Sequence, residues 1–574
     1  MKFSIGIVFL IVIINSLTAF GAEEASYNPA NANINATAVP DHVTLSWVSN
    51  PMTTQTVTWR TDSTVETGVA QYSTDKELRD NMTMSARVSL LETDLGNENI
   101  LTATLTNLKP GTQYYYRVGD GKKNWSPIYS FKTENNNTDQ FKFLVFGDSQ
   151  SGDAWKPDYS LWHSTVQNAS KANPDASFFV NVGDAVEVGQ SNAHWNNWFA
   201  ADKGVIDSIS YVPVEGNHET YDMNNNKTVP KLYESQFNVP HNGPYNNSQA
   251  YSYDYGNVHF VVLDSQFLEE QKFRPNLMND EKAWLEKDLN QTKKNWKVVF
   301  WHKTPYYTRP YRTYEDIKAA FGSILDRYHV DVVFNGHDHC YSRTYPIKND
   351  TIVSSPAEGT VYVMTGRSGA KYYNDNVPKV WDANFFDPQD MPNYIIVNVN
   401  GSKMEIKNYK MDGTLLDDYT IDKTSVDMPK TAVPPKYNKP RLVVDGALLN
   451  QPLMPTFPSQ INSKWYFPIK PVVEFLGGSE SVSGSNETLS LVVQDYTGPG
   501  IVWSDGKAHT VLLTNSSAKA TLDMTSITLP DNISVDSSNN FLITGDDMNT
   551  LFGFTWKYDS NRNILFLTNP DTNN

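Results

Sequence analysis

Short apolar runs that end in a polar side chain, in most cases after a glycine, recur through residues 140–422, and they constrain the fold more than any other feature. Examples are FKFLVFGD, ASFFVNVGD, YVPVEGNHE, WKVVFWH and VDVVFNGHDH. Two segments between such runs, NDEKAWLEKDLNQTKK with Asn279 as candidate cap and YEDIKAAFGSILDRY, space apolar residues as amphipathic helices do. Buried strands that alternate with helices predict an α/β domain whose sheets are covered on both sides.

The ends of five of these runs carry side chains that can bind cations. Because ligand sites in α/β sheets form beyond the carboxyl ends of strands, we expect these side chains to converge. Taken singly, each has a plainer explanation as a turn, a helix cap or a core histidine. However, four of the chain's 11 histidines lie in these ends, which favours a shared site. The candidate metal ligands are Asp148, Asp184, Asn217, His302, His337 and His339.

The donor types indicate which ions such a site would hold. Carboxylate, amide and imidazole donors together suit Zn, Mn or Fe, and six ligands exceed what one open catalytic ion needs. A pair of ions bridged by one carboxylate uses all six. Such pairs lie roughly 3.5–4 Å apart and clamp the attacking and leaving oxygens at phosphorus. The sequence therefore predicts a two-metal centre for phosphate-ester chemistry, with Fe, Zn or Mn as candidate ions.

The flanking regions follow other patterns. Residues 27–134, with DHVTLSWVSNPMTTQTVTWRT and TATLTNLKPGTQYYYRVG, alternate polar and apolar residues with period two and predict an antiparallel β-sandwich. A proline-rich linker at 423–440 precedes a small unit at 441–574, which has short strands and one helix-like stretch, PIKPVVEFLGG. We expect a structural or attachment role for this α+β unit, such as association with a cell wall or surface.

The N-terminus and the composition bear on location and partners. Residues 1–22 contain one lysine, an apolar run of about twelve residues and then small residues, which is typical of a signal peptide and too short to span a bilayer. No later segment is long and apolar enough to predict a transmembrane helix, so we expect a secreted protein. Cys340 is the only cysteine, which suits a bacterial exoprotein without disulfides. A net charge of −17 argues against nucleic-acid polymers as partners.

The motifs GDS, GDAVE, GNHE, WH and GHDH, in this order, resemble those of the calcineurin-like metallophosphoesterases. With the leading sandwich and GHDHCYSRTYP, the chain resembles the purple-acid-phosphatase branch from about residue 40 to 410. This resemblance implies a fibronectin type III-like first domain and a four-layer α/β catalytic domain. The last unit resembles the small N-terminal domain of copper amine oxidases through FPIKPVVEFLGG, but His509 is its only histidine, so we expect no copper there.

The resemblance also implies how the ligands divide. It assigns one metal to Asp148, Asp184 and His339, and the other to Asp184, Asn217, His302 and His337, with Asp184 as the bridge. His218 would lie against the substrate phosphate and leaving group, where a general acid or a group that stabilises negative charge is wanted.

Two positions depart from the family pattern. Glu187 stands where the purple branch has an iron-binding tyrosine, so we expect no purple colour. Gln150 stands where many non-purple members have a histidine, and its amide oxygen would ligate only weakly.

We therefore predict a secreted, acid-phosphatase-like hydrolase of small phosphate monoesters, which works by in-line attack of a metal-bound hydroxide. Arg309 and Arg312, in the loop after His302, are candidates for holding the phosphate. The alternative is that both are solvent-exposed charges of this loop without a role in binding. Tyr306 and Tyr307 either flank a leaving group or pack in the core. Two other functions remain open. One is a phosphodiesterase or nucleotide hydrolase with the same metals, and the other is a non-catalytic cell-surface binding protein.

Overall fold

The computed structural model describes residues 27–29, 35–136, 138–245, 249–309, 312, 315–387, 389–424, 439–449, 457–475, 478–483, 488–493, 509–560 and 562–568. The predicted signal peptide at 1–22 and most of the predicted linker at 423–440 lie outside these residues. Within the described residues, no helix combines the length and the apolarity that a bilayer crossing requires.

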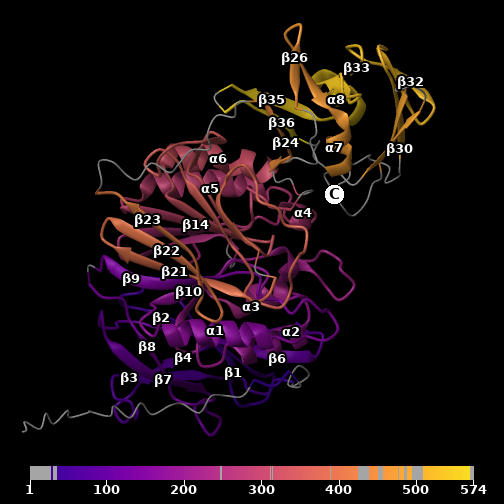
Figure 1. Cartoon of the computed structure of the whole chain (residues 1–574). Helices are drawn as coiled ribbons and strands as arrows, with labels where there is room; N and C mark the ends of the chain where they lie inside the picture. Colours follow the sequence, from indigo (N-terminus) through magenta and orange to yellow (C-terminus); the bar gives the residue numbers. More distant parts are fainter. Residues whose placement is uncertain are drawn as a thin grey trace, which may run out of the picture.

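The N-terminal domain consists of two facing four-stranded sheets, at the bottom of Figure 1. Between them lies a core that includes Val57, Trp59, Leu101 and Tyr116. A β-rich first domain is thus confirmed, whereas its likeness to fibronectin type III stays a prediction. In spatial order, the sheets contain β1 (Asp41–Ser46), β2 (Gln55–Asp62), β6 (Gly96–Leu105) and β5 (Arg87–Thr93), and β4 (Met82–Ser85), β3 (Val69–Ser73), β7 (Gln113–Gly119) and β8 (Tyr129–Lys132).

The central domain contains two larger mixed sheets. One has the order β11 (Ser210–Pro213), β10 (Phe178–Asn181), β9 (Gln140–Phe146), β21 (Asn393–Asn400), β22 (Lys403–Lys410) and β23 (Leu415–Asp422). The other has the order β12 (Tyr251–Tyr255), β13 (Val258–Val262), β14 (Trp296–Lys303), β15 (Val332–Gly336), β19 (Val361–Thr365), β16 (Tyr341–Thr344) and β20 (Asp382–Phe386). Strands β9, β10 and β11 run parallel, as do β13, β14, β15 and β19, so their carboxyl ends share an edge in each sheet.

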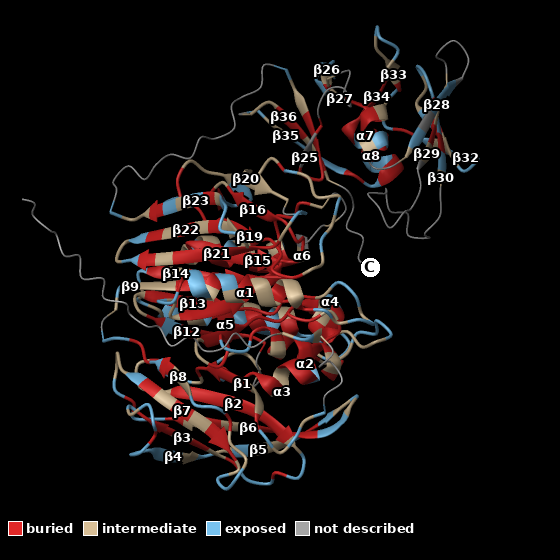
Figure 2. Cartoon of the chain, turned by 60° about the horizontal axis from the view of Figure 1, so that its bottom comes forward, coloured by how far each residue is buried: buried red, intermediate tan, exposed pale blue. Residues whose placement is uncertain are grey.

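Three apolar layers hold these sheets and their helices together (Figure 2). Between the sheets, Phe143 stacks on Phe178 with ring centroids 4.9 Å apart, and Phe260 meets both. Trp162 of α1 (Ser160–Ala172) and Trp198 of α2 (Asn192–Ala201) cover the outer face of the first sheet. α5 (Leu277–Gln291) and α6 (Glu315–Tyr328) cover the second sheet. The domain is therefore a helix–sheet–sheet–helix sandwich.

One predicted helix boundary is wrong. Helix α5 begins at Leu277 with Asn276 at the cap position, so Asn279 lies inside the first turn and does not cap it. Leu277 is 1% exposed and belongs to the core of the outer layer, which draws the helix start upstream of the polar residues that suggested a cap.

The C-terminal unit forms a lobe with its own core, at the top of Figure 1. It contains α7 (Ile469–Phe475), which the sequence predicted, and α8 (Gly545–Phe552), which it did not. α8 opens with a capping box of Thr544 and Asp547, a signal that the sequence does carry. Lys379 Nζ and Val380 N donate to Asp445 O and Gly446 O and join the lobe to the catalytic domain. Its sheets contain β25 (Ala447–Leu448), β24 (Arg441–Val444), β36 (Ile564–Thr568) and β35 (Thr555–Asp559); β26 (Ser459–Ile461), β27 (Lys464–Pro468), β34 (Phe541–Thr544) and β33 (Ser534–Val535); and β28 (Ser479–Ser483), β29 (Thr488–Val493), β30 (His509–Thr514), β31 (Lys519–Leu522) and β32 (Thr525–Thr528).

Candidate metal centre

The five polar strand ends do meet, at the edge where the carboxyl ends of both central sheets lie. Residues after β9, β10, β11 and β15, and the end of β14 itself, supply the side chains. Every one of these side chains belongs to a residue at most 7% exposed, so they form a buried polar group. They are the six predicted ligands, Asp148, Asp184, Asn217, His302, His337 and His339.

The backbone at four of these residues is left-handed. Asp148 and Asp184 have φ of 52°, and His337 and His339 have φ of 80° and 58°. Such conformations cost non-glycine residues about 1–3 kcal/mol each and persist only where the surroundings hold them, as at functional sites. The strand ends are therefore shaped to present these side chains.

Glycines before the candidate ligands allow the strand ends to approach one another. A Cβ atom at Gly183 would lie 2.6 Å from His302 Nδ1, and one at Gly336 would lie 2.6 Å from Asp148 Oδ2. Both distances are shorter than a carbon atom can tolerate. The Gly-Asp and Gly-His pairs in the sequence thus reflect close packing between strand ends.

Asp148, Asp184 and His339 form a first donor group, whose ligand atoms lie within 4.8 Å of one another. His339 Nδ1 lies 3.1 Å from the carbonyl oxygen of Lys371, which places the ring proton on Nδ1 and leaves a lone pair on Nε2. That Nε2 lies 3.1 Å from Asp148 Oδ1 and is buried without a hydrogen-bond partner among the described residues. The group is arranged as a metal requires.

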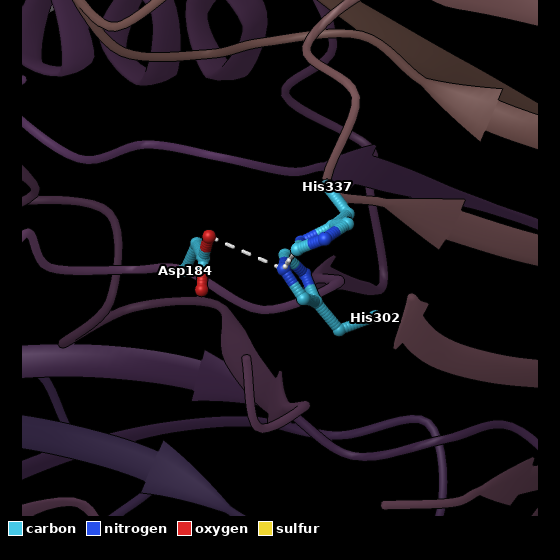
Figure 3. A group of neighbouring side chains, drawn as sticks. All are labelled: Asp184, His302 and His337. Atoms are coloured by element: carbon cyan, nitrogen blue, oxygen red, sulfur yellow. Dashed lines mark hydrogen bonds and ion pairs between the residues drawn. The ribbon is translucent and has the colours of Figure 1, made fainter. Parts of the chain in front are cut away.

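Asp184, His302 and His337 form a second group with the same spacing, shown in Figure 3. His302 Nδ1 donates to Val182 O at 3.0 Å, so the lone pair of Nε2 faces the group. Nε2 lies 3.2 Å from Asp184 Oδ2 and 3.0 Å from His337 Nδ1. The two groups share Asp184. Asn217 Oδ1 is also buried without a hydrogen-bond partner in the described part of the chain.

The charges at the centre are strongly coupled. Burial opposes the imidazolium form of His302, but the Asp184 carboxylate outweighs burial and raises the pKa of His302 to about 9. Burial likewise opposes ionisation of Asp184, yet His302 and His218 hold its pKa well below the usual range. A cation bound here would replace the proton that His302 otherwise carries. Buried acceptor atoms without partners and imidazoles oriented by carbonyls both fit metal ions.

His218 lies beside the donor groups, in the 3-10 turn η2 (Asn217–Thr220). Its backbone N–H donates to Asp184 Oδ1 at 2.9 Å, and its Nδ1 lies 2.7 Å from Glu187 O. Its side chain is 14% exposed, compared with 2% for Asp184, so it lies on the solvent side of the centre.

The structure places the two candidate arginines differently. Arg312 Nη1 donates to His337 O at 2.7 Å and so reaches the backbone of the centre. Arg309 forms a bidentate pair with Asp375, at 3.0 and 2.8 Å, and stacks on Tyr373. A phosphate-binding role for either stays a prediction. Tyr306 and Tyr307 are at most 4% exposed and pack against Trp381, as the core alternative predicted.

Three residues that sequence reasoning left out or undervalued also contact the centre. Glu219 accepts hydrogen bonds from the backbone N–H groups of Asp184 and Gly216, at 2.9 and 2.7 Å, and so ties two ligand loops together. Gln150 Nε2 donates to Asp184 Oδ2 at 3.1 Å, while its Oε1 is buried without a hydrogen-bond partner in the described residues. Lys371 reaches His218 from another loop. Glu219 belongs to the GNHE motif and could have been found there, whereas no motif marks Lys371.

The protein families that the sequence matches agree with this geometry. The family model of calcineurin-like phosphoesterases matches residues 141–341, and that of the purple acid phosphatase N-terminal domain matches residues 40–133. The chain carries a calcineurin-like phosphoesterase domain. It is a metal-dependent phosphoric ester hydrolase.

Relatives of this phosphoesterase are acid phosphatases. Purple acid phosphatase 15 of Arabidopsis thaliana is 26% identical over 387 residues, which cover 60% of this chain and 68% of the relative. Acid phosphatase type 7 of Mus musculus is 27% identical over 420 residues, covering 67% and 90%. The purple acid phosphatase PPD1 from yellow lupin seeds shares the fold, with a TM-score of 0.57 at 18% identity over 67% of this chain and 74% of that chain. The match to the calcineurin-like phosphoesterase model and the two donor groups that share Asp184 together support a dinuclear metal centre.

Proposed function

We propose that this phosphoesterase is a secreted hydrolase of small phosphate monoesters with two metal ions at the candidate centre. Asp148, Asp184 and His339 would hold one ion, and Asp184, Asn217, His302 and His337 the other. The observation that carries the proposal is the pair of buried donor groups that share Asp184. Two ions of Fe, Zn or Mn bound there would supply Lewis acidity at phosphorus and make a water molecule a stronger nucleophile.

The chain's own residues orient the donors. Carbonyl oxygens of Val182 and Lys371 fix the rings of His302 and His339, so that each presents a lone pair without rearrangement. Glu219 holds the loop of Asp184. His218, on the solvent side, is our candidate for contacting the phosphate and the departing oxygen. Both arginines pair with a carboxylate, Arg309 with Asp375 and Arg312 with Asp338. Arg312 is the better placed of the two, because it also donates to the backbone of the proposed ligand His337.

Secretion and surface attachment complete the proposal. Residues 1–22 would act as a signal peptide for export. The lobe at 441–574 would act as a copper-amine-oxidase-N-like attachment unit without copper. The N-terminal sequence of the mature protein, recovered from medium or from the cell surface, tests both.

Two esters of one chromogenic alcohol test the function. The metal-replete full chain is assayed on the monoester and the diester across a range of pH, with chelator-treated protein as the control. We expect about two metal equivalents per chain by elemental analysis and a higher kcat/KM on the monoester. A higher value on the diester would favour the phosphodiesterase alternative. No hydrolysis of either ester at any pH would favour a surface binding protein.

A further inference from the structure

A lysine from the loop after β19 forms part of the wall of the candidate metal centre. Lys371 Nζ lies 2.9 Å from Glu187 Oε1 and 2.8 Å from His218 Nε2. The carbonyl oxygen of the same residue accepts a hydrogen bond from His339 Nδ1. Lys371 therefore connects the residue that we propose faces the substrate with a proposed metal ligand.

The contact with Lys371 determines which nitrogen of His218 carries the proton. An ammonium group can only donate hydrogen bonds, so His218 Nε2 must accept. The ring proton then lies on Nδ1, where it donates to Glu187 O at 2.7 Å. A neutral imidazole of this tautomer brings no positive charge to a phosphate. The positive charge on this wall belongs to Lys371.

The surroundings of Lys371 favour its charged form. The Glu187 carboxylate, whose Oε1 lies 2.9 Å from Lys371 Nζ, stabilises the ammonium. The ammonium has three N–H bonds, and Glu187 and His218 account for two of them. The side chain is 20% exposed, more than that of Glu187 at 11%. No other residue in the described part of the chain accepts the third N–H, which is therefore available to a group that enters from solvent.

Glu187 is held in place from its other side. Gly152 N donates to Glu187 Oε2 at 3.1 Å. The loop of Gly152 lies close against the lysine, because a Cβ at Gly152 would be 3.3 Å from Lys371 Cα. The Glu187 carboxylate therefore positions the ammonium, because both carboxylate oxygens are hydrogen-bonded and the Gly152 loop packs against the lysine.

We propose that Lys371 donates a hydrogen bond to a non-bridging oxygen of the substrate phosphate and favours monoesters over diesters. The inference rests on the proposed function, which puts the substrate phosphate between the donor groups and this wall. A monoester has a second pKa of about 6 and carries nearly two negative charges at neutral pH, whereas a diester carries one. A fixed cation therefore adds more to the binding of a monoester.

Calorimetric titration with inorganic phosphate tests the proposal without relying on turnover. We compare metal-replete wild type with Lys371→Met and Lys371→Arg, and with Lys379→Met as the matched control. Lys379 is a buried lysine of the same loop, but its Nζ contacts Asp445 O, away from the centre. We expect phosphate affinity to fall about tenfold or more in Lys371→Met, as the loss of a charged hydrogen bond predicts. Lys371→Arg should keep most of the affinity and Lys379→Met all of it, with metal content unchanged in each.

A double variant separates phosphate binding from charge balance. If Lys371 only neutralised Glu187, then Glu187→Gln combined with Lys371→Met would restore wild-type phosphate affinity, and that result would overturn the proposal. We expect the double variant to bind phosphate as weakly as Lys371→Met. Unchanged affinity in Lys371→Met would also overturn it.

The same variants link the lysine to ester preference. The ratio of kcat/KM for monoester over diester should fall about tenfold in Lys371→Met. An equal loss on both esters would contradict the assigned preference. If the wild type hydrolyses neither ester, the proposed function fails, while the phosphate titration still decides whether Lys371 binds phosphate.

Discussion

Two buried groups of acidic residues lie at strand ends of the catalytic domain, and they differ in how their charge is balanced. One is the candidate metal centre. The other, here called the carboxylate cluster, consists of Glu215, Asp264 and Glu270, whose ligand atoms also lie within 4.8 Å of one another. Glu215 follows β11, Asp264 follows β13, and Glu270 ends helix α4 (Phe267–Glu270). Proximity and burial alone do not distinguish the two groups.

The residues next to each group distinguish the metal centre from the carboxylate cluster. In the metal centre, imidazoles whose Nδ1 atoms are held by carbonyl oxygens turn their Nε2 atoms toward the carboxylates. In the carboxylate cluster, N–H donors face the acids: Gln249 Nε2 lies 3.0 Å from Asp264 and 2.7 Å from Glu270, and Arg274 pairs with Glu270. Burial, and then repulsion between the acids, raises the pKa of both Glu215 and Asp264 well above the usual range. The comparison teaches that carboxylates beside imidazoles oriented by carbonyl oxygens favour a metal, whereas carboxylates beside an amide, an arginine and one another are balanced by protons and the arginine.

The largest expected effect is on the metal centre. Asp184→Ala should lose both metals and nearly all phosphatase activity, because both donor groups share this carboxylate. Elemental analysis and a monoester assay measure the two losses. Full metal content in this variant would show that Asp184 does not bridge.

A second substitution acts on the carboxylate cluster. Arg274→Met should lower the free energy of unfolding by about 3 kcal/mol, because Glu270 and Glu234 would remain buried or half-buried without their partner. Urea denaturation measures the change. Arg327→Met, which removes an exposed arginine paired with Glu286, is the control and should cost less than about 1 kcal/mol. Equal losses in the two variants would mean that the cluster does not depend on Arg274.

The smallest effect is a pH dependence. Because the pKa of Glu215 is raised in the folded state, the unfolded chain releases this proton first, and stability falls as pH rises above the ordinary carboxyl range. Glu215→Gln cannot ionise, so it should be more stable than wild type by about 1 kcal/mol or more at pH 7, with a smaller gain at pH 5. Urea denaturation at both pH values measures this. Loss of a metal equivalent in Glu215→Gln would show instead that the cluster holds a cation.

The sequence alone predicts much of the metal centre, because its signals are local. A glycine followed by a polar residue after an apolar run marks a strand end whose backbone can turn sharply, and parallel strands bring such ends to one edge. That reasoning named six candidate ligands and His218, and the structure brings these residues together. It missed α8, although Thr544 and Asp547 carry a capping signal, and it placed the cap of α5 at Asn279, because packing of Leu277 moved the helix start.

Other features depend on residues that meet only when the sheets pack. Glu215 stands in the same GNHE-containing stretch as Asn217, yet Glu215 lies among other acids, whereas Asn217 lies beside the imidazoles. No local pattern separates them, because the acids beside Glu215, which are Asp264 and Glu270, belong to other elements of the chain. Lys371 likewise acquires its partners, Glu187 and His218, from two other loops.

The sequence by itself therefore determined the class of chemistry: an α/β phosphoesterase core whose strand ends carry carboxylate, amide and imidazole donors. Only the tertiary structure decided which of those groups carry protons, which carry charge, and which lysine stands beside His218. The physical reason is that the spacing of apolar residues and glycine-permitted turns are properties of residues close together in the sequence. The pKa values and charge pairing depend instead on burial and on groups that are distant along the chain.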